Sequence, residues 1–375
     1  MGMLGFLINL LIRSLSREQL TPANVTTTDW PTLSVIIPAR NEEANIGKSL
    51  GAILKQDYPI DKLEVIVVDD HSEDRTHAIV DELAAASPVN LRCVMGRPLP
   101  KGWIGKSNAC QAGALAASGE YLLFIDADTD SSPEMLRCAV DFALRKKADL
   151  LSFNPRQEMV SRAEKLLLPG LFLAIASSMK FRESNDPACE EAIANGQAMM
   201  FRHHAYKEVD GHGLVASEIS EDLAFAKGMK TRGYTIYWAF ADEIMSTRMH
   251  TGAEEIWDGF SKNMNRIMKC ETKRHVVAGT GKALLLAWAN PLLVAASGIA
   301  CVVSPSDMYL TALAVSGLTQ IILVIASMYL VRELHQPLRY AFAIPLGLTL
   351  QGLLVLKAYQ LARNEQITWK GRVIE

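Results

Sequence analysis

Uncharged stretches near the C-terminus dominate the hydrophobic pattern of the chain. No charged side chain occurs in residues 283–306, 308–331 or 340–356. A helix needs about 20 apolar residues to cross about 30 Å of hydrocarbon, so the first two stretches are long enough and the third is marginal. Three buried core helices are the alternative, but three adjacent charge-free stretches are hard to bury in a domain of this size. The pattern predicts a transmembrane region over residues 283–356, with two crossings plus one partial or third span.

Basic residues beside this region predict its orientation. The loop 332–339 and the tail 357–375 contain Lys and Arg, whereas the loop 304–307 contains neither. Because cytoplasmic loops are enriched in Lys and Arg, we expect the loop 332–339 and the basic tail to be cytoplasmic. The protein is therefore expected in a membrane, the plasma membrane if it is bacterial.

The N-terminal segment, residues 1–30, has a different pattern. Leu4, Leu7, Ile8 and Leu11 share one face of a helix, and the apolar run is too short to span a bilayer. The segment is predicted to be an interfacial or short membrane anchor helix.

The middle of the chain alternates between strand and helix patterns. Continuous apolar runs predict strands buried on both faces at residues 33–38, 63–68, 91–95 and 121–125. Helical spacing or small residues predict helices between them at residues 41–55, 76–86 and 107–117. This alternation predicts the α/β class with a mostly parallel central sheet, whose ligands bind beyond the carboxyl ends of the strands. We expect a catalytic domain over residues 31–255 and interfacial linker helices over residues 256–282.

Composition and motif searches exclude several classes. The 375 residues are 49% hydrophobic and 21% charged, which does not fit a disordered chain. A net charge of -3 gives no support for a nucleic-acid partner. The six cysteines form no C-x-x-C pair, which argues against a disulfide framework or a zinc cluster. Neither G-x-G-x-x-G nor a complete P-loop follows a predicted strand, which argues against dinucleotide enzymes and P-loop NTPases.

Carboxylates stand where the predicted strands end. Asp126 and Asp128 alternate on an extended segment, so both side chains can point the same way. Such a pair suits a hard divalent cation, Mg²⁺ or Mn²⁺, which takes oxygen ligands and bridges phosphates. A turn with solvated carboxylates is the alternative, but the position behind an apolar strand, near other carboxylate clusters, favours the metal site.

For two further acidic pairs, a purely structural role is an alternative to a role in binding or catalysis. Asp69 and Asp70 follow the second strand, where carboxylates can accept hydrogen bonds from a ribose or a base, or simply form a turn. Glu221 and Asp222 begin a predicted helix, where helix capping alone would explain acidic residues equally well.

Several motifs in register resemble the family 2 glycosyltransferases of the GT-A fold. The matching pieces are PARNEE, VVDDHSEDRT, GKSNACQAGALAASGEYLLFIDADT, NGQAMMFRHHAYKEVDGH and SEDLAFAKGMKTRGY. They follow the order and usual spacing of that family over residues 33–234. The apolar C-terminus and the closing TWKGR resemble membrane-bound members that glycosylate lipids, namely the hopanoid-associated, carotenoid and ceramide glycosyltransferases.

The resemblance implies a role for each matching residue. By this resemblance the donor is a nucleotide sugar, a UDP-sugar, and it would be bound by Pro38, Ala39, Arg40, Glu42, Asp69, Asp70, Lys106 and Asp126. Lys106 would lie near the base or diphosphate. Which of Asp69 and Asp70 contacts the nucleotide is left open. Asp128 would bind Mg²⁺ or Mn²⁺ on the diphosphate, and Asp222 would be the catalytic base. The acceptor side would be lined by Asn195, Gly196, Gln197 and Glu221.

One departure from the family bears on the product. Processive members carry Q-x-x-R-W after the base, whereas this chain has WDGFSKNMNR at residues 257–266. A single transfer is therefore favoured over polymer synthesis, and Lys262 and Arg266 are weaker candidates for positive charge near the diphosphate.

The expected function follows from this resemblance and the apolar C-terminus. We expect inverting, metal-dependent transfer of one sugar from a UDP-hexose to the hydroxyl of a membrane lipid, by a catalytic domain that faces the cytoplasm. A polyprenyl-phosphate sugar transferase is the alternative enzyme, and an inactive transferase-fold scaffold is the alternative outside enzymes. Residues 166–177 form an apolar stretch that is either a core helix or an interfacial helix at the bilayer.

Overall fold

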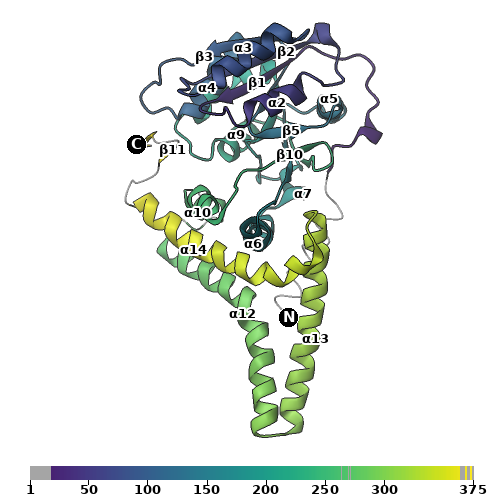
Figure 1. The fold of residues 1–375 in the computed structure, drawn as a ribbon, viewed down its shortest axis with the longest axis vertical. Helices are drawn as coiled ribbons and strands as arrows, with labels where there is room; N and C mark the ends of the chain where they lie inside the picture. Colours follow the sequence, from purple (N-terminus) through teal and green to yellow (C-terminus); the bar gives the residue numbers. More distant parts are fainter. Residues whose placement is uncertain are drawn as a thin grey trace. The chain divides into compact units, whose positions relative to one another are not determined.

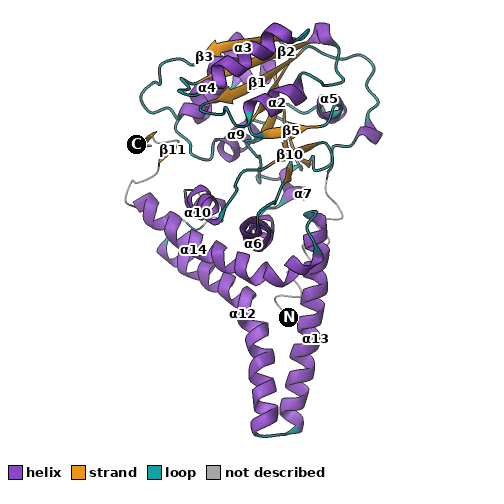
Figure 2. Cartoon of the chain, viewed as in Figure 1, coloured by secondary structure: helices purple, strands orange, loops and turns teal. Residues whose placement is uncertain are grey.

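Two compact units make up the chain. The computed structural model describes residues 18–262, 264–268, 270, 272–363, 368–369 and 372–373, so most of the predicted N-terminal helix and part of the tail lie outside the described residues. A sheet unit comprises Ser16–Glu158 and Lys180–Met249, and a helical unit includes Met159–Met179 and His250–Glu375. The long strands all belong to the sheet unit (Figure 2). Residues 159–179 thus leave the sheet unit and return to it, which no sequence pattern predicts.

The sheet unit is built on seven strands in the order β3-β2-β1-β4-β8-β6-β9. Figure 1 labels β1, β2 and β3 of this sheet. The strands are β1 (Leu33–Ala39), β2 (Leu63–Asp69), β3 (Asn90–Met95), β4 (Tyr121–Ile125), β6 (Leu150–Asn154), β8 (Ala198–Arg202) and β9 (Ile236–Phe240). Only β8 runs antiparallel to its neighbours, β4 and β6, among the described strands of this sheet. The predicted mostly parallel sheet is confirmed, and the four predicted strands correspond to β1–β4.

Helices and short elements complete the sheet unit. They are η1 (Pro22–Asn24), α2 (Ile46–Ile53), η2 (Ile60–Lys62), α3 (Thr76–Ala86), α4 (Gly105–Ala116), α5 (Met135–Lys146), α7 (Phe181–Ser184), α8 (His203–Glu208), η3 (Gly211–Val215) and α9 (Glu221–Lys230). A second, small sheet has the order β5-β10-β7 (Thr129–Ser131, Met245–Thr247, Arg156–Gln157). Helix α2 begins later than the predicted 41–55, because Asn41 adopts a left-handed φ of 53° and the chain turns before it can enter the helix.

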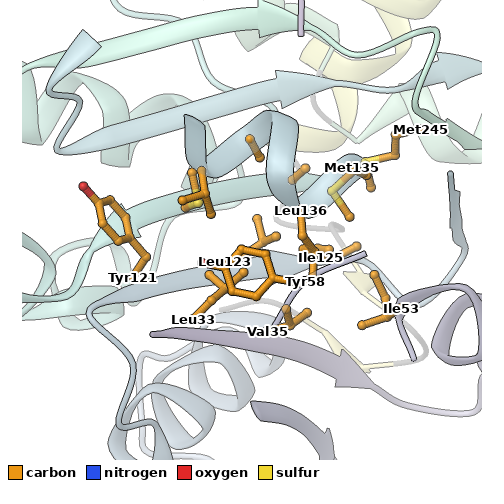
Figure 3. Packing of buried hydrophobic residues seen from close by; sticks show 14 of the residues in the cluster. Leu33, Val35, Ile53, Tyr58, Tyr121, Leu123, Ile125, Met135, Leu136 and Met245 are labelled. Carbon is orange, nitrogen blue, oxygen red and sulfur yellow. The ribbon is translucent and has the colours of Figure 1, made fainter. Parts of the chain in front are cut away.

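Alternate residues of the central strands pack on opposite faces of the sheet. Val35 and Leu123 belong to one core cluster, which Figure 3 shows together with Leu136 of α5. Ile36 and Leu122, one residue away in the same strands, belong to a second cluster on the other face. All five side chains are fully buried. The period of two in a strand buried on both faces explains why these runs are continuously apolar.

The helical unit contains one close crossing of two helices. Its elements are α6 (Arg162–Ser178), α10 (Ala253–Ser261), α11 (Met264–Ile267), α12 (Lys273–Val303), α13 (Asp307–Glu333), η4 (Leu338–Ala343), α14 (Ile344–Arg363) and the β11–β12 pair (Thr368–Trp369, Arg372–Val373). Gly170 of α6 meets Gly347 of α14, where a Cβ on Gly347 would lie 2.6 Å from the Cα of Gly170. The two backbones can approach this closely because neither residue carries a side chain.

Among the described residues, three helices are long and apolar enough to cross a membrane: Lys273–Val303, Asp307–Glu333 and Leu338–Arg363. Helices α12 and α13 form a hairpin (Figure 1). Only 11% and 17% of their most apolar windows are buried within the protein, whereas 56% of the third window is buried. The third candidate packs largely against protein, including α6 and α12.

Candidate active site

The loops that follow β1 and β2 are tied together by hydrogen bonds. The backbone N–H of Asn41 donates to the hydroxyl of Ser72 (3.0 Å), and that of Glu42 donates to the hydroxyl of Thr76 (2.8 Å). In return, the backbone N–H of Glu73 donates to the Asn41 side chain (2.8 Å). The PARNEE and DDHSED motifs therefore form one surface at the carboxyl ends of β1 and β2.

Asp69 and Asp70 are both 2% exposed, but their side chains have different partners. The Oδ1 of Asp69 accepts the backbone N–H of Ser72 (2.8 Å), and its Oδ2 lies 3.2 Å from Nδ1 of His77. Asp70 is paired with Arg40, whose Nη1 donates to the Asp70 carbonyl (2.8 Å) and lies 3.6 Å from Oδ2. Asp69 thus holds the turn between β2 and α3, while Asp70 holds Arg40 beside Pro38 and Ala39 at the end of β1.

Lys106 joins three segments that are distant in the sequence. From the first turn of α4, its Nζ lies 2.7 Å from Asp126 Oδ1 and 3.3 Å from Glu221 Oε1, and it donates to the carbonyl of Gly196 (3.4 Å). Burial alone would lower the pKa of Lys106, but the charges of Asp126 and Glu221 hold this pKa well above its usual value. Lys106 therefore stays cationic and links the D-x-D segment to the start of α9.

Asp128 lacks such a partner. Its Oδ1 is buried without a hydrogen bond. Burial, followed by the charges of Asp126 and Glu42, raises the pKa of Asp128 to about 7. A buried carboxylate oxygen without a partner, among other carboxylates, fits a cation ligand because a cation would supply both the charge and the missing contact.

The described residues contain no cluster of three or more His, Cys, Asp or Glu side chains arranged to hold a metal ion by themselves. This does not conflict with the fit of Asp128, because Mg²⁺ is usually held by one or two carboxylates together with substrate phosphates. The arrangement suits an ion that binds along with a diphosphate.

Asp222 is oriented by the backbone. Its Oδ2 accepts the N–H of Gly196 (3.0 Å), and its Oδ1 accepts the N–H of Leu223 (2.8 Å). Burial raises the pKa of Asp222, although these two N–H groups partly oppose the shift. Burial also raises the pKa of Glu221, which the charge of Lys106 opposes. Two adjacent carboxylates thus differ in their partners: backbone N–H groups for Asp222 and a lysine for Glu221.

The segment Asn195–Gln197 is held by an amide network. The Asn195 side chain donates to Asn154 Oδ1 (2.6 Å) and to Gln197 Oε1 (3.0 Å), and Gln157 also donates to Gln197 Oε1 (3.0 Å). The hydroxyl of Ser152 accepts the N–H of Asn195 (2.7 Å). Sequence reasoning missed the residues of β6 and β7 in this network, although the rule that polar residues at strand ends line sites would have pointed to Asn154.

The structure therefore brings half of the fourteen predicted site residues together through direct contacts. Lys106, Asp126, Gly196, Glu221 and Asp222 are linked by the contacts above, and Asn195 and Gln197 continue from Gly196. Lys262 lies in the helical unit, and the side chain of Arg266 lies outside the described residues.

Comparisons with known proteins place the chain near glycosyltransferases. Residues 34–210 match the family described as Glycosyl transferase family 2; the match runs from β1 through α8 and stops before Glu221. A 4,4'-diaponeurosporenoate glycosyltransferase of Staphylococcus haemolyticus is 27% identical over 72% of this chain and 68% of its own length. A beta-monoglucosyldiacylglycerol synthase of Synechocystis is 35% identical over 33% of this chain and 25% of its own length.

The fold has a solved counterpart. A mannosyltransferase from Pyrobaculum calidifontis, solved in complex with GDP-Man and Mn²⁺, superposes with a TM-score of 0.54 and 20% identity, covering 92% of this chain and 95% of that one. At this identity the likeness concerns the fold alone, which is GT-A-like.

Proposed function

Because residues 34–210 match the family 2 glycosyltransferases, we propose that the chain is an enzyme of that family and that it transfers one sugar from a UDP-hexose to the hydroxyl of a membrane lipid. The transfer is metal-dependent and inverts the anomeric centre. The observation that carries the proposal is the polar cluster around Lys106, in which Asp128 has an unpartnered buried oxygen and Asp222 is oriented by backbone N–H groups.

The donor end of the site is assigned to the loops after β1, β2 and β4. Arg40 and Asp70 would border the base and ribose, since Asp69 is already committed to Ser72 and His77. Asp128 would hold Mg²⁺ or Mn²⁺, and the ion, when bound, supplies positive charge to the departing diphosphate. Lys106 adds a second positive charge on the same side and keeps Asp126 in place.

Asp222 would serve as the general base. The acceptor oxygen forms a bond to the anomeric carbon, the bond from that carbon to the diphosphate breaks, and the hydroxyl proton passes to a carboxylate oxygen of Asp222. The raised pKa of Asp222 favours its holding that proton. A one-step displacement takes place from the face opposite the leaving group and so inverts the configuration. Glu221 has a different role, because its Oε1 is paired with Lys106.

The lipid acceptor is proposed from the helical unit and the relatives. Both relatives described above have a lipid in their names, a diaponeurosporenoate and a diacylglycerol. The uncharged part of α12, residues 283–303, is about 32 Å long at about 1.5 Å per residue, enough for a bilayer core. A soluble acceptor would not require such helices.

One assay separates the candidate functions. Membranes containing the protein are incubated with radiolabelled UDP-glucose and a lipid extract, and other UDP-hexoses follow if glucose is not used. An alkali-stable lipid glycoside is the expected product. A phosphate-linked glycolipid would instead indicate a polyprenyl-phosphate sugar transferase, and no product with any nucleotide sugar would indicate a scaffold.

The proposed topology has the tip of the α12–α13 hairpin outside the cytoplasm. We propose two crossings, by α12 and α13, with α14 as the partial span, because most of its apolar window is buried against protein. The catalytic domain then faces the cytoplasm, where nucleotide sugars are made. An impermeant thiol reagent applied to intact cells should label Ser304→Cys but not His335→Cys, which lies at the other end of α13. Labelling of the second variant alone would reverse the topology.

A further inference from the structure

Lys230, the last residue of α9, binds three backbone carbonyl groups. Its Nζ donates to the carbonyls of Glu183 (3.2 Å), Ser184 (2.6 Å) and Glu191 (2.6 Å). An ammonium group has three N–H donors, so all three are used. Hydrogen bonds from a charged donor are roughly twice as strong as neutral ones. The hydrogen bonds described for Lys230 therefore go to main-chain carbonyl groups.

The carbonyls belong to the segment that leads into the acceptor side of the site. Between α7 and β8, residues 185–197 contain no regular helix or strand. We call residues 183–197 the acceptor segment. It is folded back on itself, since the hydroxyl of the fully buried Ser184 accepts the N–H of Ile193 (2.9 Å). It is also fastened to β9, where the Asn185 side chain binds both the N–H and the carbonyl of Trp238 (2.7 and 2.8 Å).

The same helix is tied to the same segment at its other end. Asp222, in the first turn of α9, accepts the N–H of Gly196 (3.0 Å). Ten residues of helix, about 15 Å, separate the ends of α9. The acceptor segment is therefore held to α9 at Asp222 by one hydrogen bond and at Lys230 by three.

We propose that Lys230 is a positioning residue that keeps the acceptor segment aligned with the carboxylate of Asp222. This inference rests on the proposed function, in which Asp222 is the base and Asn195–Gln197 lie on the acceptor side. Without the lysine, three carbonyls lose their donor, and the segment can shift relative to Asp222. A misplacement of about 1 Å at a reacting centre can cost about 100-fold in rate. The three contacts of Lys230 all lie on the acceptor segment, so donor binding at Arg40, Asp70 and Asp128 should be unaffected.

The test compares Lys230→Met with Lys230→Arg and with a matched control. Lys227 lies on the same helix, is exposed, and its replacement by Met removes an equal charge without removing the carbonyl contacts. The full chain in detergent is assayed with UDP-glucose, or with another UDP-hexose that it uses, and a membrane lipid extract. We expect Lys230→Met to lower kcat about 10- to 100-fold with the KM for the nucleotide sugar within about twofold. Lys230→Arg should recover most of the rate, and Lys227→Met should match the wild type.

Hydrogen–deuterium exchange keeps this test independent of activity. Lys230→Met should speed exchange in residues 183–197 and leave β1 and β2 unchanged, whereas Lys227→Met should change neither. If the wild type transfers no sugar, the proposed function fails, and the exchange result still decides whether Lys230 holds the segment. The inference is overturned if Lys230→Met transfers sugar at the wild-type rate, if both kinetic constants fall together with the melting temperature, or if exchange in the segment does not change.

Discussion

The carboxyl end of the central sheet and the α12–α13 hairpin bury polar groups in opposite ways. At the sheet, Asp126 and Glu221 share Lys106, and Asp128 retains a buried oxygen without a hydrogen-bond partner. The pKa values of Asp128, Glu221 and Asp222 are all raised, mainly by burial. Burial of these carboxylates in their charged form raises the free energy of the folded protein, and a bound cation would remove that electrostatic cost.

The described polar contacts of the hairpin involve no buried charge and so carry no such electrostatic cost. Asn290 donates to Gln320 Oε1 (2.8 Å) and to the carbonyl of Ser316 (3.2 Å), and the hydroxyls of Ser297 and Ser316 lie 3.3 Å apart. These side chains are neutral and satisfy one another, as an apolar surrounding requires. The comparison teaches that buried polarity marks a binding site where it is charged and incompletely paired, and marks helix packing where it is neutral and paired.

The largest effect that would test this contrast is loss of Asp128. Asp128→Asn should abolish sugar transfer, because losing a metal ligand removes several kcal/mol of transition-state stabilisation, more than about 10³-fold in rate. Removal of the metal with EDTA should have the same effect. Asp130→Asn is the control, since Asp130 is partly exposed and pairs with Lys48. Activity near that of the wild type in Mn²⁺ would remove Asp128 from the metal site.

A second large effect should separate the adjacent carboxylates. Asp222→Asn should slow transfer about 10²- to 10⁴-fold, the usual size of a general-base contribution, while nucleotide-sugar binding measured by calorimetry persists. Glu221→Gln should cost less, because the residue holds Lys106 and does not accept the proton. If Glu221→Gln proves inactive and Asp222→Asn stays active, the two roles are reversed; if both remain active, a phosphate acceptor is favoured.

The third expected effect is on stability, and its sign is opposite to the usual cost of a substitution. The folded protein raises the pKa of Asp128 to about 7, above its value in the unfolded chain, so folding favours the protonated form. Its contribution is complete below about pH 4 and is lost as pH rises to about 7. At pH 8 without metal, Asp128→Asn should therefore stabilise the protein by about 1–4 kcal/mol. Thermal unfolding with EDTA at pH 5 and pH 8 measures this, and an equal change at both values would contradict it.

The smallest effect should come from the hairpin. Asn290→Ala removes one hydrogen bond to Gln320 and one to the backbone, and such bonds in membrane proteins average about 0.6 kcal/mol with a maximum of about 1.7. Unfolding in mixed micelles should show a decrease in the free energy of unfolding within that range. The activity of the folded protein should not change. Thr319→Ala is the control, because Thr319 is partly exposed and its hydroxyl donates to the carbonyl of Val315 in its own helix. A much larger loss would mean that the hairpin also contains a functional polar site.

What the sequence could predict depended on how local the signal was. The strands β1–β4 are continuous apolar runs, and each is recognisable without knowledge of its neighbours. Strand β8 is antiparallel because it pairs with β4 and β6 across long loops, and no local pattern encodes that pairing. The excursion of residues 159–179 into the helical unit was equally invisible, since an apolar helix looks the same whichever unit buries it.

The candidate site divides in the same way. Asp126, Asp128 and Asp222 were found because strand ends and helix starts are visible in the sequence, with the family resemblance supplying the roles. The partners of Lys106 and Lys230 were not, because a long side chain selects contacts in three dimensions. The different tasks of Asp69 and Asp70 were likewise open until the contacts of Ser72, His77 and Arg40 were known.

The close crossing of α6 and α14 has a consequence for biosynthesis. Helix α6 ends at Ser178, and its partner begins at Ile344, roughly 170 residues later, which is roughly 10–30 s of synthesis at about 5–20 residues per second. Throughout that interval the apolar face of α6, including Leu168 and Leu171, has left the ribosome without the helix that finally covers it. The nascent chain must therefore depend on a chaperone or on the membrane surface in the middle of translation, well before its spanning helices emerge. Ribosome-bound chains arrested between residues 220 and 270, before α12 begins, should show this dependence, and chains arrested before residue 150 should not.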